Sequence, residues 1–176
     1  EFGDSARALD LLQALMEDWD QYLHLRPVWE GYAFYNLALV HYQRREYAES
    51  FSFNRLATVE FRRESMWEHL RKALQNLAWS LCLMGAADEA NAALTEAEGL
   101  CRGDEANWQQ GIGRAFTCYA DGGFEEAIEL ATDIIRAEQA PNDVMSHALW
   151  LLGLSKLALG QLDDSLEIAE GAMRYA

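Results

Sequence analysis

The 176-residue sequence contains only two prolines, Pro27 and Pro141, and has no convincing run of alternating apolar and polar residues. Proline breaks helices and alternation marks half-buried strands, so these two absences favour long helices over a sheet. Apolar residues recur instead at helical spacing, for example between Leu70 and Met84. Ala, Leu and Glu, all good helix formers, are abundant. The sequence therefore predicts an all-α fold.

Basic residues are also scarce, because 14 Lys and Arg stand against 29 Asp and Glu and give a net charge of −15. Nucleic-acid binding needs clustered basic residues that displace counterions, so we expect no direct nucleic-acid binding by this chain. A hydrophobic content of 51% excludes a disordered acidic tail. The most apolar stretch, 148–159, is interrupted by Lys156 and is shorter than the ~18 to 20 residues of a membrane span. We expect a soluble chain with no membrane partner.

The three cysteines, Cys82, Cys101 and Cys118, are odd in number and show no CxxC pairing. This pattern favours buried thiols in a reducing cytoplasm over disulfides or a metal site. We therefore predict a cytoplasmic location.

Residues 1–3, Glu-Phe-Gly, begin without Met and are typical of a cloning junction. We interpret them as cloning residue and exclude them from the fold. The chain is then expected to be a fragment of a longer protein.

Motifs that carry chemistry are missing as well. The sequence contains no HExxH, Walker-type loop, G-x-S-x-G or zinc-spaced pair, and its four histidines stand far apart. "GIGRA", from Gly111 to Ala115, lacks the third glycine of a phosphate-binding loop. We predict no enzyme activity, no cofactor and no metal.

Four tight turns repeat along the chain. They read "REYAES" from Arg45, "GAADEA" from Gly85, "GGFEEA" from Gly122 and "GQLDDS" from Gly160, with starts 40, 37 and 38 residues apart. Glycine ends the first helix of a pair, acids favour the first turn of the next helix, and a small sixth residue permits close packing. We expect first helices to end near Arg44, Met84, Ala120 and Leu159. A period of this length is typical of a solenoid of helix pairs.

The segment "FYNLALVHYQRREYAESFSFNRLA", residues 34–57, resembles the tetratricopeptide repeat (TPR) family in its aromatic, Leu-small and aromatic positions. The resemblance implies a right-handed superhelical solenoid of antiparallel helix pairs, with about four repeats after an N-terminal helix at 4–27. The repeat domain would cover 28–176, with repeats at roughly 31–64, 68–103, 107–139 and 145–176. The long units resemble, more weakly, the TPR sensory arms of bacterial transcription regulators.

The third unit has two possible registers. A gap-free alignment places Arg114 where the family has a buried Leu, whereas "IGRAF", residues 112–116, matches the family pattern if its turn is two residues longer. Whether the Arg114 side chain points into the core or toward solvent stays open at this point.

The resemblance also implies a concave groove lined by the first helices of the pairs. Aromatic residues at helical spacing either stack between repeats or contact a ligand in the groove, and the sequence leaves both interpretations open. The candidate peptide- or protein-binding residues are Tyr35, Leu39, Tyr42, Gln75, Trp79, Arg114, Phe116, His147 and Trp150.

Two functional hypotheses follow. The first is a protein- or peptide-binding module that serves as the sensory or regulatory arm of a larger cytoplasmic protein. The second is a structural element for dimerisation or spacing. Ile168, Ala172 and Met173 form an apolar stripe near the end of the sequence with no following helix, so we expect a homodimer through the C-terminal helix or a longer native chain that buries it.

Overall fold

The computed structural model describes residues 4–17, 26–100, 104–137 and 140–172. Within these ranges the chain forms helices and no strand, which confirms the all-α prediction. The helices are α1 (Asp4–Glu17), α2 (Arg26–Gln43), α3 (Tyr47–Arg63), α4 (Trp67–Leu83), α5 (Ala87–Leu100), α6 (Asp104–Ala120), α7 (Phe124–Arg136), α8 (Asn142–Ala158) and α9 (Leu162–Ala172).

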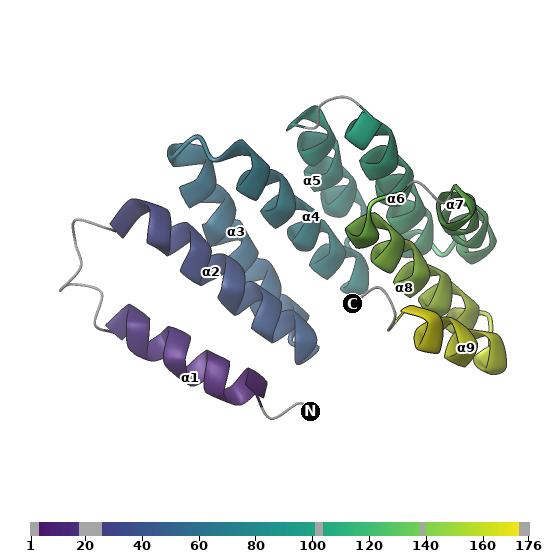
Figure 1. The fold of residues 1–176 in the computed structure, drawn as a ribbon, viewed down its shortest axis with the longest axis horizontal. Coiled ribbons are helices and arrows are strands. Elements are labelled where there is room, and N and C mark those ends of the chain that lie inside the picture. Colours follow the sequence, from purple (N-terminus) through teal and green to yellow (C-terminus); the bar gives the residue numbers. More distant parts are fainter. Residues whose placement is uncertain (1–3, 18–25, 101–103, 138–139, 173–176) are drawn as a thin grey trace.

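The helices pack as a solenoid. Helices α2 and α3, α4 and α5, α6 and α7, and α8 and α9 form successive pairs, and each pair packs against the next, while α1 packs on α2. Figure 1 shows the pairs following one another around a curved array, so that neighbours in sequence are neighbours in space. The predicted helical solenoid is confirmed.

One turn geometry recurs throughout the array. The second residue after the helix end has a positive φ, of 63° at Arg45, 77° at Gly85, 80° at Gly122 and 76° at Gly160. The next amide then donates back five residues, as in Glu46 N to His41 O at 2.9 Å and Gly123 N to Cys118 O at 2.8 Å. This is the Schellman arrangement that closes helix ends. The first helices therefore end within one residue of the predicted positions.

The same turn occurs once more, between the first and second pairs, where the sequence analysis did not find it. Ser65 has a φ of 56°, and Met66 N donates to Phe61 O at 2.8 Å. Its sequence from Ser65, "SMWEHL", carries neither the glycine nor the small sixth residue that the aligned turns show, because Leu70 stands at the sixth position.

The turn before α7 settles the register of the third unit. It has the same length and hydrogen bonds as the other turns, so the gap-free alignment holds and no longer turn exists there. Arg114 is exposed, although the resemblance to the TPR pattern implies a buried Leu at this position. Its neighbours Ala115 and Phe116 are fully buried.

Small residues at the predicted positions let the helices approach closely. Ala38, Ala78 and Ala115 on the first helices are all fully buried. So are Ser50 and Ala90, the sixth residues of their turns. Larger side chains there would force the paired helices apart.

Replacing Ser65 with glycine should stabilise the protein. An L-residue in the left-handed region costs roughly 1–2 kcal/mol and glycine avoids most of this cost, although glycine also loses more chain entropy on folding. We expect Ser65→Gly to gain about 0.5–1 kcal/mol, which corresponds to a melting temperature about 1–4 °C higher. Gly85→Ala, with its φ of 77°, should shift the melting temperature downwards. A lower melting temperature for Ser65→Gly would contradict this account of the turn.

Candidate binding groove

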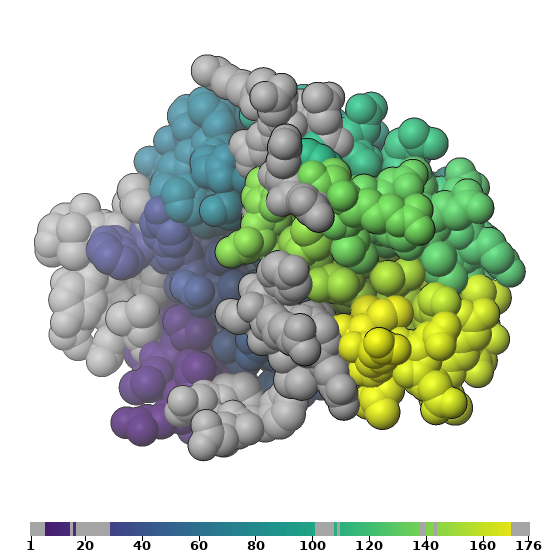
Figure 2. Space-filling view, turned by 45° about the vertical axis from the view of Figure 1, so that its right-hand side comes forward, coloured from purple at the N-terminus to yellow at the C-terminus, as the bar shows by residue number. Residues whose placement is uncertain are grey.

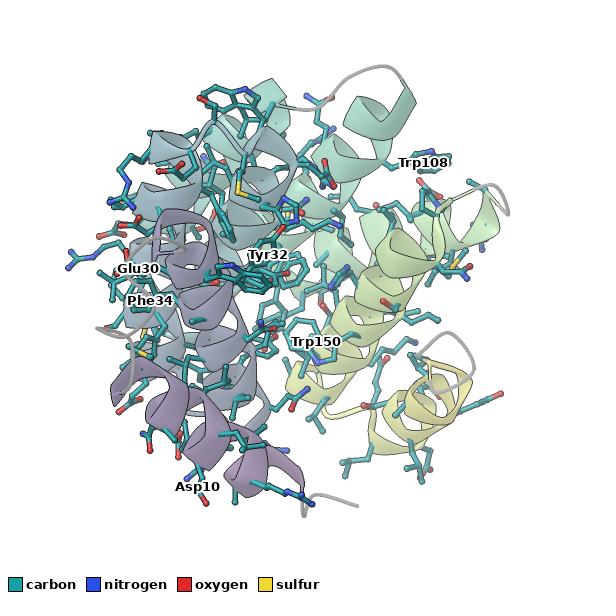
Figure 3. The ribbon with its side chains drawn as sticks, turned by 60° about the vertical axis from the view of Figure 1, so that its left-hand side comes forward. Asp10, Glu30, Tyr32, Phe34, Trp108 and Trp150 are labelled. Carbon is teal, nitrogen blue, oxygen red and sulfur yellow. The ribbon has the colours of Figure 1, made fainter. Side chains whose placement is uncertain are left out.

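A row of aromatic rings crosses the inside of the solenoid. The ring of Trp79 on α4 stacks on that of Phe116 on α6, with centroids 5.3 Å apart and planes at 20°. Phe116 contacts Trp150 on α8 at 5.6 Å, and Trp150 contacts Tyr42 on α2 at 6.2 Å. The row therefore joins the first repeat to the fourth across the superhelix. Figure 3 shows Trp150 between α8 and the N-terminal helices.

A groove of about 890 Å³ lies beside this row. Helices α2, α3 and α4 form one wall and helices α8 and α9 form the other. In the space-filling view the green surface of α8 lies against the blue surface of the N-terminal helices (Figure 2). The lining residues are Tyr35, Ala38, Leu39, Tyr42, Gln43, Ser50, Asn54, Lys72, Gln75, Asn76, Trp79, Ser146, His147, Leu149, Trp150, Gly153, Leu154, Ser165 and Ala169.

The structure brings seven of the nine predicted site residues together in this groove: Tyr35, Leu39, Tyr42, Gln75, Trp79, His147 and Trp150. Phe116 and Arg114 are not among the lining residues. Phe116 is fully buried and supports the groove from behind, through its ring contacts with Trp79 and Trp150. Arg114 is exposed elsewhere on α6.

The sequence left open whether the aromatic residues stack between repeats or line the groove, and Trp79 does both. Its side chain lines the groove, but it is only 8% exposed and belongs to the hydrophobic core. Its ring lies 3.8 Å from the His147 ring, so α4 and α8 are in direct contact. Trp150 is half-buried and offers more of its surface to a ligand.

The sequence analysis missed the contributions of the second helices. Ser50 and Asn54 come from α3, and Ser165 and Ala169 come from α9. The resemblance to TPR proteins implies a groove lined by first helices, which does not predict these residues. A signal was present, because Ser50 and Ser165 stand at the sixth turn position where the second and third units have Ala.

The groove carries almost no charge, although the chain as a whole has a net charge of −15. Among its described lining residues there is no Asp or Glu, and Lys72 is the only Lys or Arg. The Lys72 ammonium lies 3.5 Å from Glu68, on a side chain that is 48% exposed. Polar lining is otherwise supplied by amides and hydroxyls, including Gln43, Asn54, Gln75 and Asn76.

The phenols that line the groove and the thiol of Cys82 favour their neutral forms. Burial raises the pKa of Tyr42 well above its ordinary value of 10. Burial also raises the pKa of Tyr35, despite an opposing hydrogen bond with the Asn76 side chain. Behind the groove, burial raises the pKa of the Cys82 thiol to about 12. These groups stay protonated at neutral pH, so none of them is an activated base or nucleophile.

A chain of hydrogen bonds connects three lining residues of the groove, Ser50, Asn54 and Asn76, through the buried Ser80. Ser80 Oγ donates to the Asn76 carbonyl at 3.0 Å, and Ser50 Oγ lies 3.1 Å from Ser80 Oγ. The Asn54 amide nitrogen donates to Ser50 Oγ at 3.5 Å. Asn54 is 1% exposed, and its Oδ1 has no hydrogen-bond partner among the described residues. Trp79 Nε1 is likewise buried and without one. Each such atom is an energetic cost to the fold.

Solved structures of other proteins share this architecture. Two crystal structures of a kinesin light chain-like protein from Podospora anserina, built of nearly identical TPR-like repeats, match the chain with TM-scores of 0.58 and 0.57. Both matches cover 98% of this chain and 87% of that chain, at 18% sequence identity. The fold is TPR-like. No protein-family model and no curated protein matches the sequence. At 18% identity the likeness concerns the fold alone.

The far end of the TPR-like array exposes an apolar stripe on α9. Leu162 is 66% exposed and Leu166 is 63% exposed, one helical turn apart. Ile168, which the sequence analysis placed in such a stripe, is half-buried and faces Gly153 of α8. The side chain of Ala172 and the whole of Met173 lie outside the described residues.

The described part of the TPR-like fold offers neither a membrane-spanning helix nor a cluster of metal ligands. None of its helices is long and apolar enough to cross a membrane. No group of three or more His, Cys, Asp or Glu residues that are described is placed to hold a metal ion. Cys82 and Cys118 are free thiols, the first buried and the second half-buried, while Cys101 lies outside the described residues.

Proposed function

We propose that this TPR-like chain is a protein-interaction module that holds a short extended peptide segment in the groove between its two walls. The observation that carries the proposal is the convergence of Tyr35, Tyr42 and Trp150 on one groove of about 890 Å³. Aromatic side chains supply large contact area at low entropic cost, and solenoids commonly bind partners on concave surfaces. In a larger cytoplasmic protein, such a module would serve as a sensory or regulatory arm.

The chemistry of the groove supports binding rather than catalysis. Its phenols are protonated, and none of its described lining residues carries a carboxylate. Acid–base or nucleophilic catalysis requires a group with a pKa matched to the reaction, held beside a partner. We therefore propose a non-enzymatic role, without a cofactor and without direct nucleic-acid binding.

A display library of random ten-residue peptides provides a probe. We expect selection on the immobilised chain to recover related sequences, and fluorescence anisotropy to give dissociation constants on the order of micromolar for a labelled peptide. Leu154→Arg, in the α8 wall, should abolish this binding. Val59→Arg, at a site on α3 that is 52% exposed, is the control and should bind normally.

Circular dichroism melts must show that both variants remain folded. Recovery of no related peptides, or equal binding by folded Leu154→Arg and Val59→Arg variants, would overturn the groove as a peptide site.

The exposed leucines of α9 favour a second candidate function, self-association through the C-terminal helix. Leu162 and Leu166 form an apolar stripe, but Asp163 and Glu167 lie beside it and would repel a second copy. Salt screens such repulsion. We therefore expect a dimer in sedimentation velocity at tens of micromolar that becomes more populated in 0.5 M NaCl.

A Leu162→Ser, Leu166→Ser double variant should sediment as a monomer under both salt conditions. A monomeric parent chain at both salt concentrations would contradict the self-association proposal without affecting the groove.

A further inference from the structure

We propose that the outer face of α3 is a second docking surface, and that it binds an acidic amphipathic helix of a partner protein. We define the outer face as the exposed residues of α3 from residue 52 to residue 63, which are Ser52, Arg55, Leu56, Val59, Arg62 and Arg63. None of the six lines the groove, so the inference goes beyond the proposed function and does not depend on it.

The solenoid leaves the outer face uncovered. Helix α3 lies between α2 and α4 and packs on no other described helix (Figure 1). Its buried side chains recur at helical spacing and are Ser50, Asn54, Ala57, Thr58 and Phe61. Because a helix turns once in 3.6 residues, the outer face lies on the opposite side of α3 from these side chains. It is therefore open to a partner.

Two aliphatic side chains form the apolar part of the outer face. Leu56 is 41% exposed and Val59 is 52% exposed. Residues three apart on a helix are neighbours on its surface, so the two form one small apolar patch. Isolated apolar side chains are common on protein surfaces and do not by themselves indicate a partner. The charge around this patch supplies the second observation.

The outer face belongs to the one basic region of an acidic chain. Seven of the fourteen Lys and Arg lie between residues 44 and 72, alongside five Glu, so this segment carries a net charge of +2 and the remainder carries −17. The outer face itself has three arginines and no Asp or Glu. The exposed acid of α3, Glu49, precedes it in the first turn. The apolar patch is thus flanked by positive charge.

Arg55 is the arginine whose charge is least compensated. Arg62 forms an ion pair with Glu96 at 2.5 Å, and Arg63 forms one with Glu64 at 3.1 Å. Arg55 is exposed and forms no ion pair with any described residue. A carboxylate of a partner would therefore gain a charge-assisted hydrogen bond from Arg55 without displacing another acid. The exposed ion pairs of Arg62 and Arg63 are weak and can be exchanged at little cost.

These features together define the chemistry of the partner. A helix with apolar residues on one face can pack on Leu56 and Val59, while Asp or Glu residues beside that face meet the arginines. The charge of −17 on the rest of the chain disfavours long polyanions such as nucleic acids. A short acidic helix avoids most of this repulsion, because salt screens charges more than about 10 Å apart at physiological ionic strength.

A pair of peptides tests the proposed chemistry. Each has about sixteen residues, with leucines on one helical face, and carries a hydrocarbon staple so that both are helical. The first has glutamate at the other positions and the second has glutamine. By fluorescence anisotropy at about 0.15 M NaCl, we expect the glutamate peptide to bind with a dissociation constant on the order of tens of micromolar. The glutamine peptide should bind at least tenfold more weakly, because it offers Arg55 no carboxylate.

Two variants of the full chain locate the site. Arg55→Gln should bind the glutamate peptide about fivefold more weakly, whereas Arg114→Gln should bind it normally. Arg114 is the matched control, because it is also exposed on a helix and forms no ion pair with a described residue. Val59→Ser should weaken binding about fivefold. Its control is Leu157→Ser, at a site on α8 that is 47% exposed and outside the groove.

Circular dichroism melts establish that all four variants are folded. Equal binding of the two peptides, or no saturable binding below about 1 mM, would overturn the inference. Equal affinities of folded Arg55→Gln and Arg114→Gln variants would also overturn it. A dimer of the parent chain that Val59→Ser abolishes would make a second copy the occupant, against the proposal of a partner protein. The groove is tested separately, because its peptide depends on Leu154 and not on Val59.

Discussion

Phe116→Ala is expected to destabilise the protein by about 3–5 kcal/mol, out of a total stability that is typically about 5–15 kcal/mol. The side chain is fully buried and its ring contacts Trp79 on one side and Trp150 on the other. Its removal would leave a cavity between α4, α6 and α8. Because a solenoid holds together through contacts between neighbouring repeats, the loss should lower the stability of the whole array. Denaturant unfolding followed by circular dichroism measures the change.

Phe124→Ala serves as the control for this substitution. Phe124 is half-buried at the start of α7, and its ring contacts Tyr119 alone among the described aromatic residues. The same deletion should cost clearly less there, because part of the ring is already in water. A Phe116→Ala variant within about 1 kcal/mol of the parent chain would show that the aromatic row does not hold the repeats together.

Trp150→Ala is expected to weaken binding of a selected peptide by about 2 kcal/mol or more, which is roughly 30-fold, while the protein stays folded. Trp150 is half-buried, lines the groove and contacts Tyr42 and Phe116 with its ring. A partly exposed aromatic side chain that lines a groove has the properties of a binding hot spot. Its loss should cost less stability than Phe116→Ala, because more of its surface is exposed.

Trp67→Ala is the matched control for the binding measurement. Trp67 is 50% exposed at the start of α4 and does not line the groove. We expect its removal to change neither affinity nor stability by more than about 0.5 kcal/mol. Equal affinities for Trp150→Ala and the parent chain would remove Trp150 from the site and leave the aromatic row with a structural role only.

The repeating turns made most of the fold predictable from the sequence. Gly85, Gly122 and Gly160 each occupy the left-handed position that ends a helix, and the acids that follow them begin the next one. The turn at Ser65 could not be predicted from the pattern, because it has neither a glycine nor the small sixth residue of the other turns. Arg45 shows that the same conformation tolerates a residue other than glycine, at some energetic cost.

The candidate site was less predictable than the fold. Helical spacing brought Tyr35, Tyr42 and Trp150 to the inner face, because positions within one helix follow from a 3.6-residue period. The contact between Tyr42 and Trp150 instead depends on how far the array curves over four repeats. That curvature is the sum of small rotations between pairs, and no local pattern encodes it. Asn54 was missed for a related reason, since it reaches the groove from the second helix of a pair.

Site-specific photo-cross-linking tests the central claim most directly, which is that a peptide lies between the α2–α4 wall and the α8–α9 wall. A benzophenone amino acid is placed separately at Leu39 on the first wall, at Leu154 on the second wall and at Val59 on the outer face of α3. A biotin-labelled selected peptide is then irradiated with each variant. We predict cross-links from Leu39 and from Leu154 that unlabelled peptide suppresses, and none from Val59. Cross-linking from Val59 as strong as from the two wall positions would contradict the account.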